Sequence, residues 1–483
     1  MTFGEFTAAV VAELGFEPNA QQRQVIEALA RFCSPARARQ LDSIHGSHDR
    51  VFVLNGYAGT GKTSLSGALV RALARAGIKS QLMAPTGRAA KVFSALAGKP
   101  AYTIHRRIYR HSLGGEMPGL QTNNATDTVF IVDEASMIGD EDGFATGAYG
   151  SANEQGGLLA DLIQYVYGAE GCRMILLGDT AQLPPVGSDI SPAMDPEVLR
   201  GMGLTVSHAT LTAIARQGAL SGILANATAL RRAMRALADK LPMPRFVTDG
   251  YDDVRYVDPA DMPEFIDSCY RRDGIDQTIV VTRSNRRAVD FNIGVRQQVL
   301  YLEEEITSGE LLMVARNNYR WSRGVKGLDF IANGDTVAVT HVYGSEFRYG
   351  VKFADVRLTI PGNEEIVFDA KVMSDTLFSD APGMAPGMAQ KIYNGIMAEH
   401  GCEPDAATRS RILRDNPYWN ALVVKYGYAV TCHKAQGGQW RNVFVDLGYI
   451  PEDGLMTELY RWLYTAVTRA RTRLFIIAPS DHD

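Results

Sequence analysis

Eight residues in the first quarter of the sequence have the composition and spacing of a phosphate-binding loop: Gly56-Tyr57-Ala58-Gly59-Thr60-Gly61-Lys62-Thr63. Glycines let backbone N–H groups converge on phosphate oxygens, and a following helix start favours negative charge. Lys62 is expected to neutralise the outer phosphates, and the Thr63 hydroxyl to bind Mg²⁺. A chance glycine-rich turn is the alternative. The nucleotide-binding residues that this pattern predicts are Gly56, Ala58, Gly59, Thr60, Gly61, Lys62, Thr63 and Ser64.

Two adjacent carboxylates follow a later apolar stretch. Val129–Val132 predicts a buried strand that ends at Asp133 and Glu134. Asp133 is expected to join the magnesium shell, and Glu134 to orient and deprotonate an attacking water. A solvent-exposed helix start, where acids are also favourable, is the alternative. With the phosphate loop, the pair predicts an NTPase but not its class, because kinases, transporters and GTPases share both motifs.

A third polar cluster, GDTAQLPPVG at Gly178–Gly187, follows the apolar run Met174–Leu177. Taken alone, it indicates a tight turn, because Gly-Asp begins turns and prolines break strand pairing. Pro184 and Pro185 fix φ and remove two backbone donors, so the segment is expected to be stiff. A stiff segment can transmit a displacement that a flexible one would absorb.

Strands alternate with helices in two parts of the chain, which predicts an α/β fold with parallel sheets covered on both faces. Sites in such sheets lie beyond the carboxyl ends of the strands, and we expect every polar cluster to lie there. The second α/β pattern begins at Thr278–Thr282 and resumes at Tyr428. Between them, residues 333–372 predict an inserted β-barrel, and a linker, Ala381–Gly387, precedes two short helices.

The expected domain boundaries follow from this alternation. Residues 1–210 form the first α/β domain, with a small hairpin insertion at about 107–127. Residues 211–312 and 421–483 form the second, and residues 313–420 hold the barrel and its helices. The stretch Gly139–Gly157 is rich in Gly, Ala and acids, and we assign it no function.

Composition is that of an ordinary globular protein, with 46% hydrophobic and 21% charged residues. The net charge of -5 gives no global signal for nucleic acid, so such binding would need a local basic surface. The five cysteines are scattered without zinc-ligand spacing, which predicts a reduced, cytoplasmic chain. Neither an ordinary signal peptide nor an apolar run of membrane-span length is evident.

The motifs, taken in order, resemble those of superfamily-1 helicases, most closely the RecD-like and phage Dda-like branch. The resemblance spans residues 19 to 470 and lies in Asn19–Gln22, GYAGTGKT, APTGRAA (Ala84–Ala90), YTIHR (Tyr102–Arg106), VDEAS (Val132–Ser136), GDTAQLPPVG, LTAIARQ (Leu211–Gln217), NGD (Asn333–Asp335), TCHKAQGGQW (Thr431–Trp440) and LYTAVTRA (Leu463–Ala470). It implies two RecA-like P-loop domains that clamp ATP between them, with an SH3-like barrel inserted in the second.

The resemblance also implies roles for individual residues. Gln22 would recognise adenine, and Gln182 would contact the γ-phosphate, so that its segment links the nucleotide to a bound strand. Arg216 and Arg469 would complete the catalytic site from the second domain, where they would stabilise charge in the transition state. The implied nucleic-acid contacts are Pro85, Thr86, Arg88, Thr103, His105, Arg106, Thr431, His433 and Lys434.

The family activity implied is ATP-dependent DNA unwinding with movement 5′ to 3′ along single strands. Its partners would be single-stranded DNA, single-strand/duplex junctions and proteins of replication, recombination or repair, in a bacterial or phage-infected cell. Two positions depart from the family: Ala435 replaces a usual Ser, and Gln439 a usual acid. Met117-Pro118 is the candidate tip of a duplex-splitting hairpin.

Three alternatives remain open. An RNA helicase or RNA-dependent ATPase would use the same phosphate and stacking contacts. A DNA-binding loader or motor subunit of a nuclease complex would lack unwinding of its own, although the intact Lys62/Thr63 and Asp133/Glu134 pairs argue against an inactive subunit. A small-molecule kinase is disfavoured by the motifs after Gly178 and by the second α/β domain.

Overall fold

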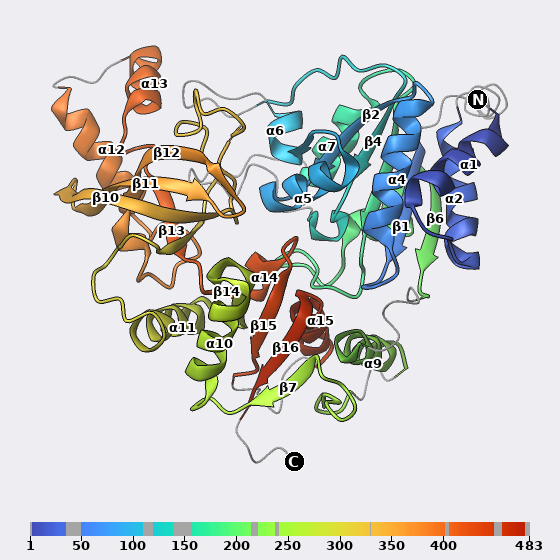
Figure 1. Cartoon of the computed structure of the whole chain (residues 1–483). Helices are drawn as coiled ribbons and strands as arrows, with labels where there is room; N and C mark the ends of the chain where they lie inside the picture. Colours follow the sequence, from blue (N-terminus) through green and yellow to red (C-terminus); the bar gives the residue numbers. More distant parts are fainter. Residues whose placement is uncertain are drawn as a thin grey trace. The chain divides into compact units, whose positions relative to one another are not determined.

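The computed structural model describes residues 2–34, 50–109, 119–139, 157–213, 221–236, 241–328, 330–400, 405–448 and 456–478. The chain forms two compact units (Figure 1). The first comprises Met1–His111 and Met117–Leu220, and the second contains Ser221–Asp483. Among the described residues, no helix is long and apolar enough to cross a bilayer. The four cysteines within these ranges, Cys33, Cys172, Cys269 and Cys432, form no disulfide.

The first unit is built on a six-stranded sheet whose neighbouring strands all run parallel. Its strands, in spatial order, are β3 (Ala101–Thr103), β2 (Lys79–Ala84), β4 (Thr128–Val132), β5 (Arg173–Gly178), β1 (Arg50–Gly56) and β6 (Thr205–Leu211). The two apolar runs that the sequence indicated as strands, at Val129–Val132 and Met174–Leu177, are confirmed as β4 and β5. Every residue of β4 and β5 is buried, as expected for strands covered by helices on both faces.

Helices cover both faces of this sheet. The side chains of β1 point alternately to the two faces and contact a separate apolar core on each. Phe52 and Leu54 pack into one apolar core, while Val51 and Val53 pack into another, because successive side chains point to opposite faces. The first core includes α1 (Phe3–Leu14), α2 (Ala20–Cys33), α4 (Lys62–Arg75) and α5 (Gly87–Ala97). The second includes α6 (Ile104–Ile108), α7 (Leu158–Tyr167) and α8 (Pro196–Gly201).

The second unit contains a five-stranded parallel sheet and a closed barrel. The sheet order is β14 (Ala429–Thr431), β8 (Thr278–Thr282), β15 (Trp440–Asp446), β16 (Ala470–Ile477) and β7 (Val254–Val257). Its helices are α9 (Gly222–Ala236), α10 (Met262–Asp273), α11 (Asn285–Gln298), α14 (Cys432–Ala435) and α15 (Met456–Val467). The prediction of two parallel α/β domains is thereby confirmed.

The predicted barrel is also confirmed, and it closes through two strands that the sequence pattern did not reveal. The predicted strands are β10 (Thr336–Arg348), β11 (Val351–Ile360) and β12 (Asn363–Met373). The added strands are β9 (Leu311–Val314) and β13 (Leu422–Tyr426), so the barrel extends beyond both ends of the 313–420 range. Two helices, α12 (Met388–Glu399) and α13 (Ala406–Asp415), follow the linker as expected.

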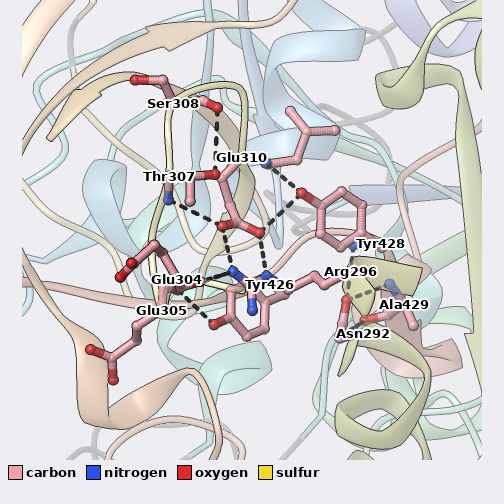
Figure 2. A network of polar contacts seen from close by, with 11 residues as sticks. Asn292, Arg296, Glu304, Glu305, Thr307, Ser308, Glu310, Tyr426, Tyr428 and Ala429 are labelled. Atoms are coloured by element: carbon pink, nitrogen blue, oxygen red, sulfur yellow. Dashed lines mark hydrogen bonds and ion pairs between the residues drawn. The ribbon is translucent and has the colours of Figure 1, made fainter. Parts of the chain in front are cut away.

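A buried polar network joins the barrel to the helix α11 (Figure 2). Arg296 on α11 donates from Nε to Glu310 Oε1 at 2.7 Å, and their side chains are 5% and 0% exposed. Tyr428 donates its hydroxyl to the same carboxylate, and the Arg296 guanidinium lies 4.4 Å from the centre of the Tyr426 ring. Asn292, one turn earlier, bonds the backbone of Tyr428 and Ala429. A buried charge that lacks its partner costs free energy. The network therefore favours the one packing of the barrel against α11 in which Arg296 and Glu310 meet.

We predict that Arg296→Met destabilises the second unit by about 3 kcal/mol, because it leaves the Glu310 carboxylate buried and unpaired. All four tryptophans of the chain lie in this unit, so their fluorescence during urea unfolding reports on it selectively. The matched control is Arg271→Met, which breaks a solvent-exposed pair with Asp267 on α10 and should cost less than about 1 kcal/mol. Equal losses in the two variants would contradict the prediction.

Candidate functional site

Three loops meet at one edge of the first sheet, where β4, β5 and β1 end side by side. Asn55 on β1 pairs with Gly178 on β5, and Val132 on β4 pairs with Leu176 on β5. The phosphate-loop pattern follows β1, the two carboxylates follow β4, and GDTAQLPPVG follows β5. The structure therefore brings together the three clusters that the sequence placed far apart.

The loop at Gly56–Thr63 has the local geometry that its glycines predict. Gly59 and Gly61 have φ of 75° and 81°, a region that favours glycine, and Gly61 precedes the first turn of α4. A Cβ added at Gly56 would lie 2.9 Å from Lys62 Cβ, so only glycine lets the lysine stem pass here. Lys62 is nearly buried, Thr63 is half-buried and Ser64 is exposed at the start of α4.

The positive charge of Lys62 acts on the carboxylate of Asp133. Burial raises the pKa of Asp133 to about 6, the Lys62 charge opposes this shift, and the neighbouring Glu134 adds to it. Glu134 has φ of 53°, in the left-handed region that is strained for a residue other than glycine. Its Oε2 atom is buried without a hydrogen-bond partner, and so is Oε1 of Gln182 on the adjacent loop. Two buried oxygens without partners indicate that a further group belongs at this edge.

The oxygen atoms at this edge fit a magnesium nucleotide. Mg²⁺ prefers oxygen ligands and usually takes one or two protein groups together with phosphates and water. The Thr63 hydroxyl and the Asp133 carboxylate are donors of that kind, beside a loop shaped for phosphate. Within the described ranges, no group of three or more His, Cys, Asp or Glu side chains is arranged to hold a metal by itself. Two protein oxygens, from Thr63 and Asp133, match the small number of protein ligands that Mg²⁺ takes when phosphates and water complete its shell.

The GDTAQLPPVG segment is attached to both neighbouring loops. Asn55 at the end of β1 bonds Thr180 through its amide nitrogen and its amide oxygen, at 3.0 and 3.1 Å. Ser191 donates to the Ser136 carbonyl at 2.8 Å, two residues after Glu134. At Gly178, an added Cβ would lie 2.6 Å from Met194 Sδ and 2.9 Å from the Ser136 backbone nitrogen. The segment therefore contacts the end of β1 through Thr180 and the backbone of Ser136 through Gly178.

Sequence reasoning missed these connecting residues. Asn55 had a recognisable signal, since it is the polar end of the apolar run that leads into the phosphate loop. Ser136 and Ser191 had none, because they lie 55 residues apart and only the fold brings them into contact.

Gln22 lies against the phosphate loop, but both ends of its amide are already bonded. It donates to the Thr60 carbonyl at 3.0 Å and accepts from the Asn19 backbone nitrogen at 3.0 Å. The second bond belongs to a capping box at the start of α2, which explains the Asn cap seen in the sequence. The structure thus assigns Gln22 a part in supporting the loop, and adenine recognition stays a prediction.

The predicted nucleic-acid residues of the first unit lie at the same sheet edge, after β2 and β3. Thr86 and Thr103 accept from backbone nitrogens in the first turns of α5 and α6, so both hydroxyls serve as helix caps. Thr103 is buried, and Arg106 lies 5.0 Å from the centre of the Tyr102 ring. Pro85, Arg88, His105 and Arg106 are half-buried.

In the second unit, Thr431, His433 and Lys434 cluster at the end of β14. Thr431 and Lys434 are half-buried, and His433 is exposed. Arg469 does not lie at a carboxyl end, because it immediately precedes β16. The expectation that every polar cluster follows a strand is therefore wrong for this residue. Arg469 is buried, and it donates to the carbonyls of Thr465 and Gly438 and to the Thr468 hydroxyl.

Some predicted features lie outside the described residues. They are Arg216, the hairpin tip Met117-Pro118 and most of the stretch Gly139–Gly157.

Two family models match parts of the chain. The AAA domain model matches residues 33–147, and the UvrD-like helicase C-terminal domain model matches residues 426–477. The first match covers the phosphate loop and the paired carboxylates. The second covers the cluster at Thr431–Lys434 and Arg469.

Relatives of known identity were also found. The ATP-dependent RecD2 DNA helicase of Deinococcus radiodurans is 26% identical over 456 residues, which cover 92% of this chain and 48% of that protein. The chain therefore spans about half the length of this relative. A Pif1 helicase from Bacteroides in complex with ADP-AlF3 and single-stranded DNA is 15% identical, with 92% of each chain covered and a TM-score of 0.45. A Pif1 helicase from Candida albicans is 16% identical, with a TM-score of 0.46 over 96% of this chain and 94% of that one.

Proposed function

We propose that this chain is an ATP-dependent DNA helicase that moves on single strands. The order of its motifs and its RecD2 relative support its assignment as a RecD-like helicase of superfamily 1. The observation that carries the proposal is the single edge of the first sheet. There the phosphate loop, Glu134 and Gln182 lie at β1, β4 and β5, and the candidate strand-binding loops lie at β2 and β3. The central loop, after β5, thus has structural bonds to both parts of the nucleotide site.

Each side chain of the nucleotide half has a role in this proposal. The loop N–H groups and Lys62 would bind the phosphates, and Thr63 and Asp133 would hold Mg²⁺, which would supply positive charge near the phosphate oxygens. The unpartnered Oε2 atom of Glu134 accepts a proton from the attacking water. The unpartnered Oε1 atom of Gln182 accepts a hydrogen bond from that water, and its amide N–H₂ can donate to the γ-phosphate. Arg216 and Arg469 supply further positive charge in the transition state.

The strand-binding half of the proposal rests on residues that hold a phosphate backbone without identifying bases. These are Pro85, Thr86, Arg88, Thr103, His105, Arg106, Thr431, His433 and Lys434, contributed by both units. Alternate gripping of one strand by the two units during ATP turnover would produce movement. We propose 5′-to-3′ polarity, action at single-strand/duplex junctions and a cytoplasmic role in replication, recombination or repair, as the RecD-like resemblance suggests.

Lys62→Ala should lower the ATPase rate stimulated by single-stranded DNA by roughly 100-fold or more, because it removes the charge that faces the outer phosphates. Lys79→Ala is the matched control, since Lys79 begins β2 at the opposite edge of the same sheet and is exposed. Circular dichroism of both variants checks the fold. An active Lys62→Ala enzyme would overturn the assignment of the site, and stimulation by RNA instead of DNA would favour an RNA-dependent motor.

Gln182→Ala should keep binding of ATP and of DNA while losing most of the stimulation of one by the other. The reason is that the substitution removes the buried, unpartnered Oε1 atom proposed to bond the attacking water, while the bonds of the same segment to Asn55 remain. ATPase rates with and without single-stranded DNA measure the coupling, and Gln164→Ala on the exposed face of α7 is the control. If DNA stimulates the Gln182→Ala enzyme normally and unwinding persists, the segment is only a turn.

Polarity is tested with two duplexes that carry a single-stranded tail at either the 5′ or the 3′ end. The protein should unwind the 5′-tailed duplex in the presence of ATP and Mg²⁺ and leave the 3′-tailed duplex intact. Unwinding of the 3′-tailed duplex alone would exclude the proposed direction while leaving the helicase assignment in place.

A further inference from the structure

Two half-buried lysines of the second unit line one small pocket between the barrel and the sheet. Lys425 lies on β13, the last strand of the barrel, and Lys434 lies on α14, directly after β14. Asn285 at the start of α11, Ser379 and Thr431 contribute polar groups to the same pocket. Only Thr431 and Lys434 belong to a motif that the sequence had singled out.

The two ammonium groups are held by backbone carbonyls rather than by carboxylates. Lys425 Nζ donates to the Thr376 carbonyl at 2.6 Å and to the Ser379 carbonyl at 2.8 Å. Lys434 Nζ donates to the Pro382 carbonyl at 2.7 Å. Neither lysine forms an ion pair with any carboxylate in the described part of the chain, in contrast to the barrel residue Lys371, which pairs with Glu346 and Asp355. An ammonium has three N–H donors, so both groups keep donors for another acceptor.

The two ammonium charges in this pocket repel each other and are partly removed from water. Burial and the nearby Lys434 charge lower the pKa of Lys425 to about 8, against a smaller opposing effect of Asp380. Burial also lowers the pKa of Lys434. Each lysine thus gains from an anion that would neutralise the pair, because a bound negative charge removes both the repulsion and much of the desolvation cost.

The pocket is built in advance by the buried network of Figure 2. Tyr426, the neighbour of Lys425 on β13, donates its hydroxyl to the Glu305 carbonyl and packs under Arg296. Asn292 of α11 lines the pocket and fixes the backbone that leads into β14. The strand that carries Lys425 and the strand that leads to Lys434 are therefore both anchored to α11. Because these strands are already fixed, ligand binding to the pocket requires little further ordering of the backbone and its free-energy cost is small.

We propose that Lys425 and Lys434 together bind a phosphate oxygen of the nucleic-acid strand, so that the barrel contributes a contact of its own. This inference rests on the proposed function, and it adds Lys425 to the strand-binding residues. Among the aliphatic side chains and the methionine that make up about half of the lining, the polar groups are ammonium, hydroxyl and amide donors, and none of the lining residues is aromatic. Such a set suits a phosphate rather than a stacked base, and the contact is therefore independent of base sequence.

The test is the salt dependence of single-stranded DNA binding, measured by fluorescence anisotropy of a labelled oligonucleotide. Losing one phosphate contact should make the slope of log K against log salt shallower by about 0.7. Lys425→Met should show this change and bind roughly tenfold more weakly, and Lys425→Arg should restore the slope. The control is Lys391→Met, which removes an exposed lysine from α12. Tryptophan fluorescence checks that each variant is folded.

The outcomes separate this inference from the function on which it rests. If the wild-type protein neither binds single-stranded DNA nor is stimulated by it, the proposed function fails. If the wild type does both and Lys425→Met keeps the wild-type slope, only the inference fails, even where the variant is less stable. If inorganic phosphate raises the unfolding temperature of the wild type but not of Lys425→Met, while the DNA slope is unchanged, the pocket binds free phosphate and the strand assignment is overturned.

Discussion

The parallel pairing of β4, β5 and β1 is the constraint on which the candidate site depends. Parallel strands that pair in register end at one edge, and here three consecutive strands in space deliver a phosphate loop, two carboxylates and the Gln182 segment to that edge. The close approach of Gly178 to Ser136 leaves no room for a side chain between the last two. The loop after β5 therefore packs directly against the loop after β4.

In the second unit, the barrel is inserted between two strands that are neighbours in the parallel sheet. β8 and β14 are neighbours in the sheet, although the whole barrel lies between them in the sequence. The Arg296–Glu310 pair lies where the chain leaves for the barrel, and Tyr426 and Tyr428 lie where it returns. A deeply buried ion pair is stable only when its two charged groups meet. The Arg296–Glu310 pair therefore holds the segment that enters the barrel close to the segment that leaves it. The same arrangement brings Lys425 beside Lys434.

Several candidate side chains already have hydrogen bonds within their own unit. Gln22 bonds Asn19 and Thr60, and Arg469 bonds three groups around the start of β16. A ligand that engages them must replace those bonds, at a cost of about 1 kcal/mol for each bond that is not re-formed. In contrast, the buried oxygens Glu134 Oε2 and Gln182 Oε1 have no hydrogen-bond partner, so a ligand that reached them would replace no bond of theirs.

The two α/β domains, most of the barrel and the glycine-rich loop could be predicted from the sequence, because these depend on local patterns of apolar residues, glycines and prolines. Asp133 and Glu134 were predicted as site residues because they follow an apolar strand, whereas the role of Gln182 was predicted from the resemblance to superfamily-1 helicases. The sequence pattern missed β9 and β13, which are short strands whose pairing is decided by barrel closure. It misplaced Arg469, and it gave no sign of the Ser136–Ser191 bond or of the pocket that Lys425 and Lys434 both line. Those contacts join residues far apart in the chain, and only the packing of strands and helices decides which distant side chains meet.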